Sequence, residues 1–275
     1  MRILITGHKG FIGQNLFKHL AHKGHTVEGY DYIPDVLPDV SKYDQVIHLG
    51  AISSTTETDV EKIMIQNFDF SCKLLYLCNM MGINFQYASS ASVYGLTQNF
   101  KEDAAMSPLS AYAWSKFLFD RMIKSVSYNE YNISVQGFRY FNVYGAHEEH
   151  KGNQASPISK FIQQAQQTGV IKLFENSEKY LRDFVCVDDV CDVHEQMLTK
   201  DVNGIFNVGT GTPISFAEVA EIIAKKYNAR IELVPMPTQL KAQYQTYTCA
   251  DTTLLNTHVN VQYKTIEEYI RNDRE

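Results

Sequence analysis

Short apolar runs alternate with longer stretches of helical spacing in the first half of the chain. The runs are rich in β-branched and aromatic residues, which favour strands. They predict strands at residues 2–6, 26–31, 45–49, 84–88 and 133–138. Between the first two, Ile12, Leu16 and Leu20 recur every four residues and Gly24 follows, a pattern typical of a helix that glycine ends. Strands and helices in alternation predict parallel strands joined by helical crossovers, the α/β class.

Two longer helical patterns follow in the same half of the chain. One covers residues 60–81 and stops at Gly82, and the other covers residues 110–128 after Pro108. We therefore expect helices on both faces of the sheet. Residues 32–44 contain two prolines and are too few for a further helix and strand, so one helix–strand unit common in such folds is predicted to be missing.

The pattern loosens after the fifth predicted strand. A polar loop at residues 146–156 precedes helices near 158–168 and at 216–227, and short strands at 184–187 and 205–208 are predicted to return to the main sheet. A second, smaller lobe is therefore expected to be discontinuous in sequence. We assign residues 1–142, about 183–210 and about 247–261 to the first domain, and residues 143–182, about 211–246 and 262–275 to the second lobe.

Composition and charge exclude several classes of protein. A chain of 275 residues with 44% hydrophobic content can bury a sizeable core. Its net charge of −6, with Lys and Arg scattered along the chain, argues against nucleic acid or an anionic membrane as a partner. The longest apolar runs fall far short of the ~20 residues that cross a bilayer, and the first residues enter a strand with no room for a signal peptide.

Cysteine and histidine usage points to a cytoplasmic protein without a structural metal. The five cysteines are an odd number and include no Cys-x-x-Cys pair, as expected for reduced thiols. His147 and His150 stand beside two glutamates in the polar loop, which we interpret as solvated. No metal site is predicted.

Three glycines, Gly7, Gly10 and Gly13, stand between the first predicted strand and the first predicted helix. In that position the spacing indicates a dinucleotide-binding loop of a Rossmann-like, doubly wound sheet, with the pyrophosphate at the helix N-terminus. Asp31 ends the second strand, where a carboxylate accepts hydrogen bonds from ribose hydroxyls and repels a 2′-phosphate. Lys9 is a contrary signal, because its ammonium could neutralise that phosphate. We predict NAD as the cofactor, with NADP as the alternative.

A Tyr/Lys pair provides the candidate chemistry. Tyr112 and Lys116 are four residues apart on one predicted helix and so share a face. An ammonium beside a phenol favours the phenolate, which predicts a lowered pKa for Tyr112 and proton exchange with a sugar hydroxyl. Ser90 follows another strand end, where it can share the same substrate oxygen. Small residues after a third strand, Gly50 and Ala51, leave room for a cofactor.

Together these residues resemble the extended short-chain dehydrogenase/reductase family over essentially the whole chain. Longer stretches resemble its ADP-glyceromanno-heptose 6-epimerase subfamily, namely residues 50–57, 87–91, 115–120, 137–145, 150–152, 182–185 and 205–211. The resemblance implies a homo-oligomer with a nucleotide-sugar substrate. Ser90 and Tyr112 would attend the oxidised carbon, Lys116 would support Tyr112, and Lys151 would be a second acid/base. Residues 33–40 contain none of the lysines that suit NADP in that subfamily.

The expected contacts of the ligands divide into two groups. Expected cofactor contacts are Gly7, Gly10, Phe11, Ile12, Gly13, Asp31, Leu49, Ala51, Asn67, Tyr112 and Lys116. Expected contacts of the sugar nucleotide are Ser53, Glu57, Ser90, Asn142, Arg182 and Tyr244.

Three alternatives to a heptose epimerase have different requirements. A 4,6-dehydratase needs an additional acid and base after the active-site hydroxyl, whereas Ala91 and Ser92 follow Ser90 here. A UDP-sugar 4-epimerase needs only one hydroxyl pair and stays open. A protein that binds a dinucleotide without turnover would not need Ser90, Tyr112 and Lys116 together.

Overall fold

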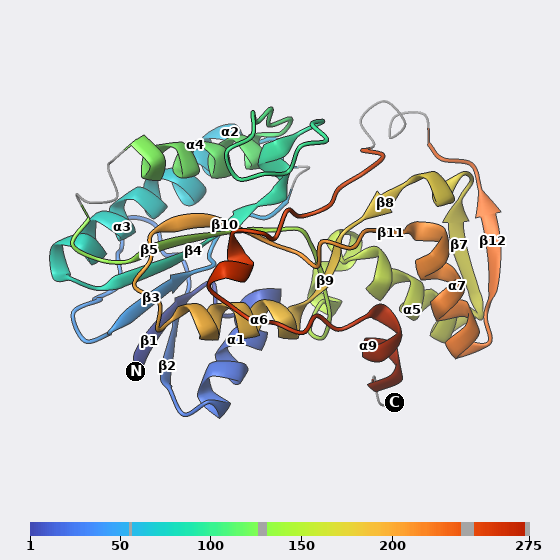
Figure 1. The fold of residues 1–275 in the computed structure, drawn as a ribbon, viewed down its shortest axis with the longest axis horizontal. Helices are drawn as coiled ribbons and strands as arrows, with labels where there is room; N and C mark the ends of the chain where they lie inside the picture. Colours follow the sequence, from blue (N-terminus) through green and yellow to red (C-terminus); the bar gives the residue numbers. More distant parts are fainter. Residues whose placement is uncertain (55–56, 126–130, 238–244, 273–275) are drawn as a thin grey trace.

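The centre of the protein is a six-stranded parallel sheet in a computed structural model that describes residues 1–54, 57–125, 131–237 and 245–272 (Figure 1). Its strands lie in the order β10-β5-β4-β3-β1-β2. Their bounds are β1 Arg2–Thr6, β2 Thr26–Tyr30, β3 Gln45–His48, β4 Asn84–Ser90, β5 Val135–Tyr140 and β10 Gly204–Val208. The Rossmann-like α/β class predicted from sequence is confirmed.

Helices cover both faces of this sheet because its strands bury both sets of alternating side chains. Leu4 faces a cluster that contains Leu74 of α3 and Ile123 of α4, whereas its neighbour Ile3 packs with Leu16 of α1 on the opposite face. The helices α3 and α4 therefore form one outer layer, and α1 and α6 form the other (Figure 1). These helices are α1 Phe11–His22, α3 Phe70–Met81, α4 Ala111–Ser125 and α6 Val187–Met197.

The helical pattern at residues 60–81 is interrupted in the structure. It begins as α2 (Val60–Ile63), passes through a π-helical segment, η1 (Met64–Asp69), and continues as α3 to Gly82, which has φ 70°. A π-helical turn contains about one residue more than an α-helical turn, so the side chains after it point in a different direction from that expected for a regular helix. The single regular helix that the apolar spacing suggests is thus replaced by three segments, while the predicted end at Gly82 is confirmed.

The predicted missing unit is confirmed at the other edge of the sheet. The edge strand β2 is followed at residues 31–44 by loop containing one isolated bridge, Ile33 to Val36, before β3. The strand at 205–208 returns to the main sheet as β10, as expected. The one predicted at 184–187 does not. It forms β9 (Phe184–Cys186) and pairs with β6 (Asn142–Tyr144), outside the main sheet, whose edge on this side is β10.

A second hydrophobic cluster lies beyond the strand pair β6–β9. It contains residues of α5 (Pro157–Thr168), α7 (Phe216–Tyr227) and α9 (Ile266–Asn272) together with strand β7 (Val170–Phe174). β7 pairs in parallel with β12 (Arg230–Val234), and β8 (Leu181–Arg182) pairs with β11 (Ile214–Ser215). These elements gather at the end of the molecule away from β2 (Figure 1).

The remaining elements are short 3₁₀ segments. They are η2 Ala91–Tyr94, η4 Glu149–Gln154, η5 Ser177–Lys179 and η6 Leu255–Thr257. Within the described ranges, no helix has both the length and the apolar character needed to cross a membrane.

Candidate active site at the carboxyl edge of the sheet

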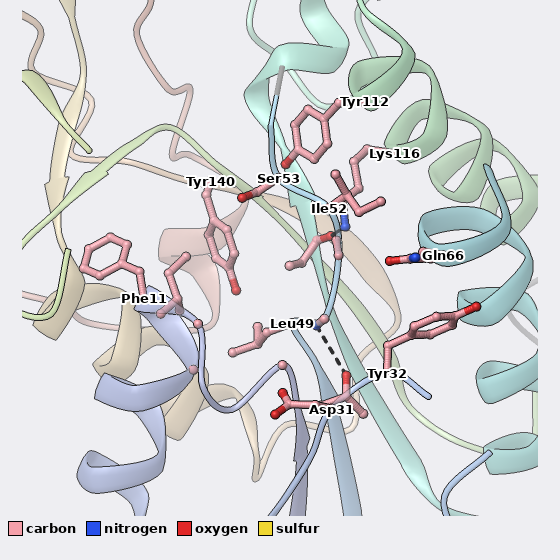
Figure 2. Close-up of a pocket in the computed structure, with 18 of the residues that line it drawn as sticks. Phe11, Asp31, Tyr32, Leu49, Ile52, Ser53, Gln66, Tyr112, Lys116 and Tyr140 are labelled. Carbon is pink, nitrogen blue, oxygen red and sulfur yellow. Dashed lines mark hydrogen bonds between the residues drawn. The ribbon is translucent and has the colours of Figure 1, made fainter. Parts of the chain in front are cut away.

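A cavity of about 390 Å³ opens at the carboxyl ends of the central strands. This edge is where open parallel sheets hold their ligands, because loops and helix N-termini converge there. Figure 2 shows side chains that enter it from the glycine loop, from the strand ends and from α4. Its lining comprises Thr6, Gly7, Gly10, Phe11, Ile12, Gly13, Asp31, Tyr32, Leu49, Gly50, Ala51, Ile52, Ser53, Gln66, Phe70, Ala88, Ser89, Tyr112, Lys116, Tyr140, His150 and Lys151.

The N-terminus of α1 follows the glycine loop and faces the cavity without a side-chain cap. A Cβ on Gly7 would lie 2.6 Å from the Cα of Gly50, and one on Gly13 would lie 2.2 Å from the carbonyl oxygen of Gly7. A side chain at either position would clash with the backbone, so both positions require glycine. The loop can therefore pack directly against the neighbouring strand end and helix. Gly10 is the N-cap of α1 and supplies no side-chain cap. The backbone N–H groups of the first turn of α1 and the helix dipole therefore fit a pyrophosphate at this point.

Asp31 lies at the opposite end of the cavity from Tyr112 (Figure 2). Its carboxylate forms an ion pair with Lys9, whose Nζ lies 2.9 Å from Oδ2, and His8 Nδ1 lies 3.5 Å from Oδ1. Lys9 is 77% exposed, so solvent screens this pair strongly. A ribose bound beside Asp31 would meet the carboxylate and the ammonium together.

The Tyr/Lys pair lies on the buried side of α4. Lys116 donates a hydrogen bond from Nζ to the carbonyl oxygen of Ala88, at 2.8 Å, and a hydrogen bond joins Tyr112 to Ser90. Burial lowers the pKa of Lys116 to about 8. Burial also raises the pKa of Tyr112, and the hydrogen bond with Ser90 offsets only part of that rise. The predicted lowering of the Tyr112 pKa is therefore wrong, because desolvation of the phenolate is the largest influence on it.

Lys151 reaches the same cavity from the segment η4. Its Nζ lies 4.9 Å from the centre of the Phe11 ring. In Figure 2, Phe11 lies across the cavity from Tyr112 and Lys116. The cavity thus receives a phenol and a lysine from α4 and a second lysine beside the glycine loop, far apart in sequence. A phenol and two lysine side chains therefore border one space.

A family model described as the NAD dependent epimerase/dehydratase family matches residues 3–209 of the chain. The chain belongs to this family.

Solved structures of epimerases and of a dehydratase have the same fold as this chain. The ADP-L-glycero-D-manno-heptose-6-epimerase of Helicobacter pylori is 26% identical with a TM-score of 0.86, over 99% of this chain and 94% of that chain. An NAD-dependent NDP-hexosamine 5,6-dehydratase of tunicamycin biosynthesis is 26% identical with a TM-score of 0.84, over 98% and 95%. The UDP-glucose 4-epimerase of Thermus thermophilus, in complex with NAD, is 25% identical with a TM-score of 0.82, over 98% and 97%.

Most of the expected cofactor contacts of this epimerase/dehydratase family member line the cavity. Asn67 lies behind its wall instead. Its amide accepts a hydrogen bond from the N–H of Ile52 at 2.8 Å and donates to the carbonyl oxygen of Ile52 at 3.0 Å and to Ser115 Oγ at 3.2 Å. Asn67 therefore ties Ile52, which does line the cavity, to the π-helical segment η1.

The expected sugar-nucleotide contacts are more dispersed. Ser53 lines the cavity, whereas Glu57 accepts hydrogen bonds from the N–H groups of Thr58 and Asp59 before α2. Arg182 donates to the carbonyl oxygens of residues 181 and 245, and its guanidinium lies 5.4 Å from the ring centre of Phe216. The half-buried Asn142 lies on β6. Tyr244 lies outside the described residues.

Sequence reasoning missed part of the cavity and a neighbouring one. Tyr140 ends β5, so its place at a strand end was a usable signal. Gln66 and Phe70 reach the cavity from the π-helical region, which the apolar spacing does not reveal. A second cavity of about 250 Å³ lies beside α5 and β7. It is lined by Pro157, Lys160, Phe161, Gln164, Lys172, Leu173, Phe174, Ser177, Tyr180, Phe216 and Met236.

Proposed function

We propose that this chain is an NAD-dependent epimerase of a nucleotide-activated sugar, and specifically an ADP-glycero-manno-heptose 6-epimerase. One observation carries the proposal: Tyr112, Lys116 and Lys151 all reach a single cavity, with Lys151 over Phe11 and the Tyr/Lys pair across from it. The likeness in fold to a heptose 6-epimerase supports it.

Epimerisation at C6 of a heptose calls for two proton-exchanging groups. The C5–C6 bond lies outside the sugar ring, so a carbonyl at C6 can rotate and present its other face. The same rotation moves the carbonyl oxygen to a new place. Tyr112, supported by Ser90 and Lys116, would exchange the proton at the first place, and Lys151 at the second. NAD, when bound, supplies the hydride acceptor and donor.

The distribution of carboxylates favours epimerisation over dehydration. Elimination of water needs an acid and a base near the reacting carbon. Among the described residues that line the cavity, Asp31 is the only carboxylate, and it lies at the end away from Tyr112. A ring 4-epimerase stays the second candidate, because it needs Tyr112 and its partners but not Lys151, and a UDP-glucose 4-epimerase has the same fold.

Asp31 and the glycine loop favour NAD over NADP in this proposal. A carboxylate at the end of β2 suits ribose hydroxyls, and the exposed Lys9 opposes it only weakly. The second region of the chain, residues 143–182 with about 211–246 and 262–275, would be the substrate lobe. We further propose a cytoplasmic homo-oligomer, on the family resemblance.

Replacement of Lys151 tests this function. We expect Lys151→Met to keep the fold and to lose interconversion of the C6 epimers by ~10²-fold or more, as for other lost acid/base groups. Product stereochemistry is read by NMR after incubation with an ADP-heptose and with UDP-hexoses. Lys179→Met, at an exposed lysine of η5, is the matched control.

Each other outcome of this experiment has a definite meaning. Activity of Lys151→Met within a few-fold of the parent contradicts the two-base mechanism and favours the 4-epimerase. Accumulation of NADH in strict proportion to product contradicts epimerisation, which returns the hydride to the same carbon. Recovery of every substrate unchanged with the parent enzyme indicates a protein that only binds the dinucleotide.

A further inference from the structure

Glu148 is a buried carboxylate beside Lys151, and it has no part in the proposed proton exchange. Its side chain is 2% exposed. It accepts hydrogen bonds from the N–H and the hydroxyl of Ser156, at 3.1 and 2.6 Å, and from the hydroxyl of Ser159. Lys151 Nζ lies 3.4 Å from its Oε1.

The helix α5 does not need this carboxylate as its cap. Ser156 is the N-cap of α5, and its Oγ already accepts the N–H of Ser159. Burial of a carboxylate is costly unless it is paired and hydrogen bonded. The two serine hydroxyls and the helix N-terminus offset that cost from one side, and the ammonium of Lys151 offsets it from the other.

The same contacts restrain Lys151. A lysine in a polar loop ordinarily extends its ammonium into water, yet the side chain of Lys151 is only 24% exposed. Its Nζ is close to both the carboxylate of Glu148, at 3.4 Å, and the centre of the Phe11 ring, at 4.9 Å. The backbone N–H of Lys151 also donates to the carbonyl oxygen of Glu148, at 2.9 Å. Two attachments to one residue hold the ammonium at the cavity.

We propose that Glu148 is a positioning residue, which holds the ammonium of Lys151 over Phe11 and fastens it to the first turn of α5. This inference rests on the proposed acid/base function of Lys151. Pro157 and Lys160 of the same turn line the second cavity. A single buried carboxylate therefore links the first turn of α5 to the lysine at the active-site cavity.

Charge removal at Glu148 tests the inference. Glu148→Gln keeps the size of the side chain and an acceptor for the serine hydroxyls, but loses the charge that holds Lys151. We expect kcat to fall ~10-fold or more with KM within about two-fold, because positioning of a reacting group affects the chemical step. The exposed neighbour provides the matched control: Glu149→Gln should keep both constants.

A double-mutant cycle separates positioning from a merely structural role. If Glu148 acts through Lys151, Glu148→Gln adds no further loss of rate in the Lys151→Met background. Glu148→Asp keeps the charge but moves it one methylene away from Lys151, so kcat should also fall. This variant replaces Glu148→Gln in the experiment if the Gln variant does not fold.

The outcomes distinguish the two proposals. Loss of activity in Lys151→Met with parental kcat in Glu148→Gln, or in Glu148→Asp where that variant is used, overturns the positioning inference and leaves the proposed function standing. Parental activity in Lys151→Met overturns the proposed function, and with it the inference. Rate losses that simply add in the double variant also overturn the inference.

Discussion

At the scale of a single residue, burial of the Lys116 ammonium lowers the free energy of unfolding of the protein. Its pKa is lowered to about 8 from the ordinary value of 10.5, because its ammonium is buried. Below pH 8 the side chain is charged in both the folded and the unfolded protein, and the folded state carries the desolvation cost, about 3 kcal/mol at ~1.4 kcal/mol per pKa unit. Above pH 10.5 the side chain is neutral in both states, and the cost is gone.

Lys116→Met should therefore stabilise the protein while it abolishes turnover. We expect the free energy of unfolding to rise by about 1–3 kcal/mol at pH 7, since the lost hydrogen bond to Ala88 offsets part of the gain. The gain should shrink as pH rises from 8 to 10.5. Urea unfolding at several pH values measures it, with Lys73→Met at an exposed position of α3 as the control. A variant less stable than the parent at pH 7 would contradict the argument.

Tyr112 provides a second prediction at the same scale. Tyr112→Phe removes one oxygen and little volume, so the fold should survive while the rate falls by ~10²-fold or more. Burial raises the pKa of this phenol, so the unsubstituted enzyme holds it protonated as a hydrogen-bond donor at neutral pH. Steady-state kinetics measures the change, and Tyr76→Phe on the exposed face of α3 is the control. Near-parental turnover would show that the Tyr/Lys pair is only structural.

At the scale of elements, a buried ionic network sets the position of α4 against the sheet. Asp120, two turns beyond Tyr112, accepts hydrogen bonds from Arg139 Nε at 2.8 Å, from Ser89 Oγ at 2.9 Å and from the hydroxyl of Tyr87 at 3.0 Å. Both charged partners are almost fully buried. The helix that carries the proposed catalytic pair is therefore tied to β4 and β5 by a single carboxylate.

Loss of the Asp120 charge should destabilise this arrangement strongly. Asp120→Asn leaves the guanidinium of Arg139 buried without its counter-charge, which typically costs about 3–5 kcal/mol. The midpoint of denaturant unfolding should fall accordingly, and turnover should fall with it. Asp103→Asn, at an exposed loop residue, should leave the midpoint unchanged. A change below about 1 kcal/mol at Asp120 would show that water reaches the pair.

At the scale of the whole molecule, Asp189 connects the region of the main sheet to the segment that leads into the C-terminal helix α9. It lies on α6, which packs beside the main sheet, and accepts a hydrogen bond from the N–H of Lys264, at 2.9 Å. Lys264 leads into α9, whose Ile266 and Ile270 belong to the second hydrophobic cluster. Burial raises the pKa of Asp189 to about 6. Between about pH 4 and pH 6 the folded protein therefore holds a proton on Asp189 that the unfolded chain has released.

This shift predicts a definite dependence of stability on pH. Because the pKa of Asp189 is higher in the folded protein than in the unfolded chain, this carboxyl contributes stability below its unfolded pKa of about 4. That contribution is lost as pH rises through its folded pKa of about 6. Asp189→Asn should raise the free energy of unfolding by about 1–3 kcal/mol at pH 7 and change it little near pH 4. Thermal unfolding at both pH values measures the difference. An equal effect at pH 4 and pH 7 would contradict a titrating Asp189.

Local patterns in the sequence were sufficient for several of the individual elements. The strand at residues 2–6 and the helix at 216–227 have their predicted bounds, because apolar periodicity and glycine or serine at the ends act within a few residues. The glycine loop and the Tyr112/Lys116 spacing belong to the same local level. The Rossmann-like class also followed, since strands alternating with helices predict parallel strands joined by helical crossovers.

Contacts between distant segments were decided only by the tertiary structure. The partner of β9 depends on which strand the fold brings beside it, and the pKa of Tyr112 depends on how completely the phenol is desolvated. Neighbouring residues determine neither of these. The burial of Glu148 against Lys151 and the start of α5 likewise appears only when the loop has folded. Periodicity and turn residues report short-range preferences of the backbone. Desolvation and pairing depend on what the rest of the chain places around a group, which is why many of the elements could be predicted and the electrostatics of the site could not.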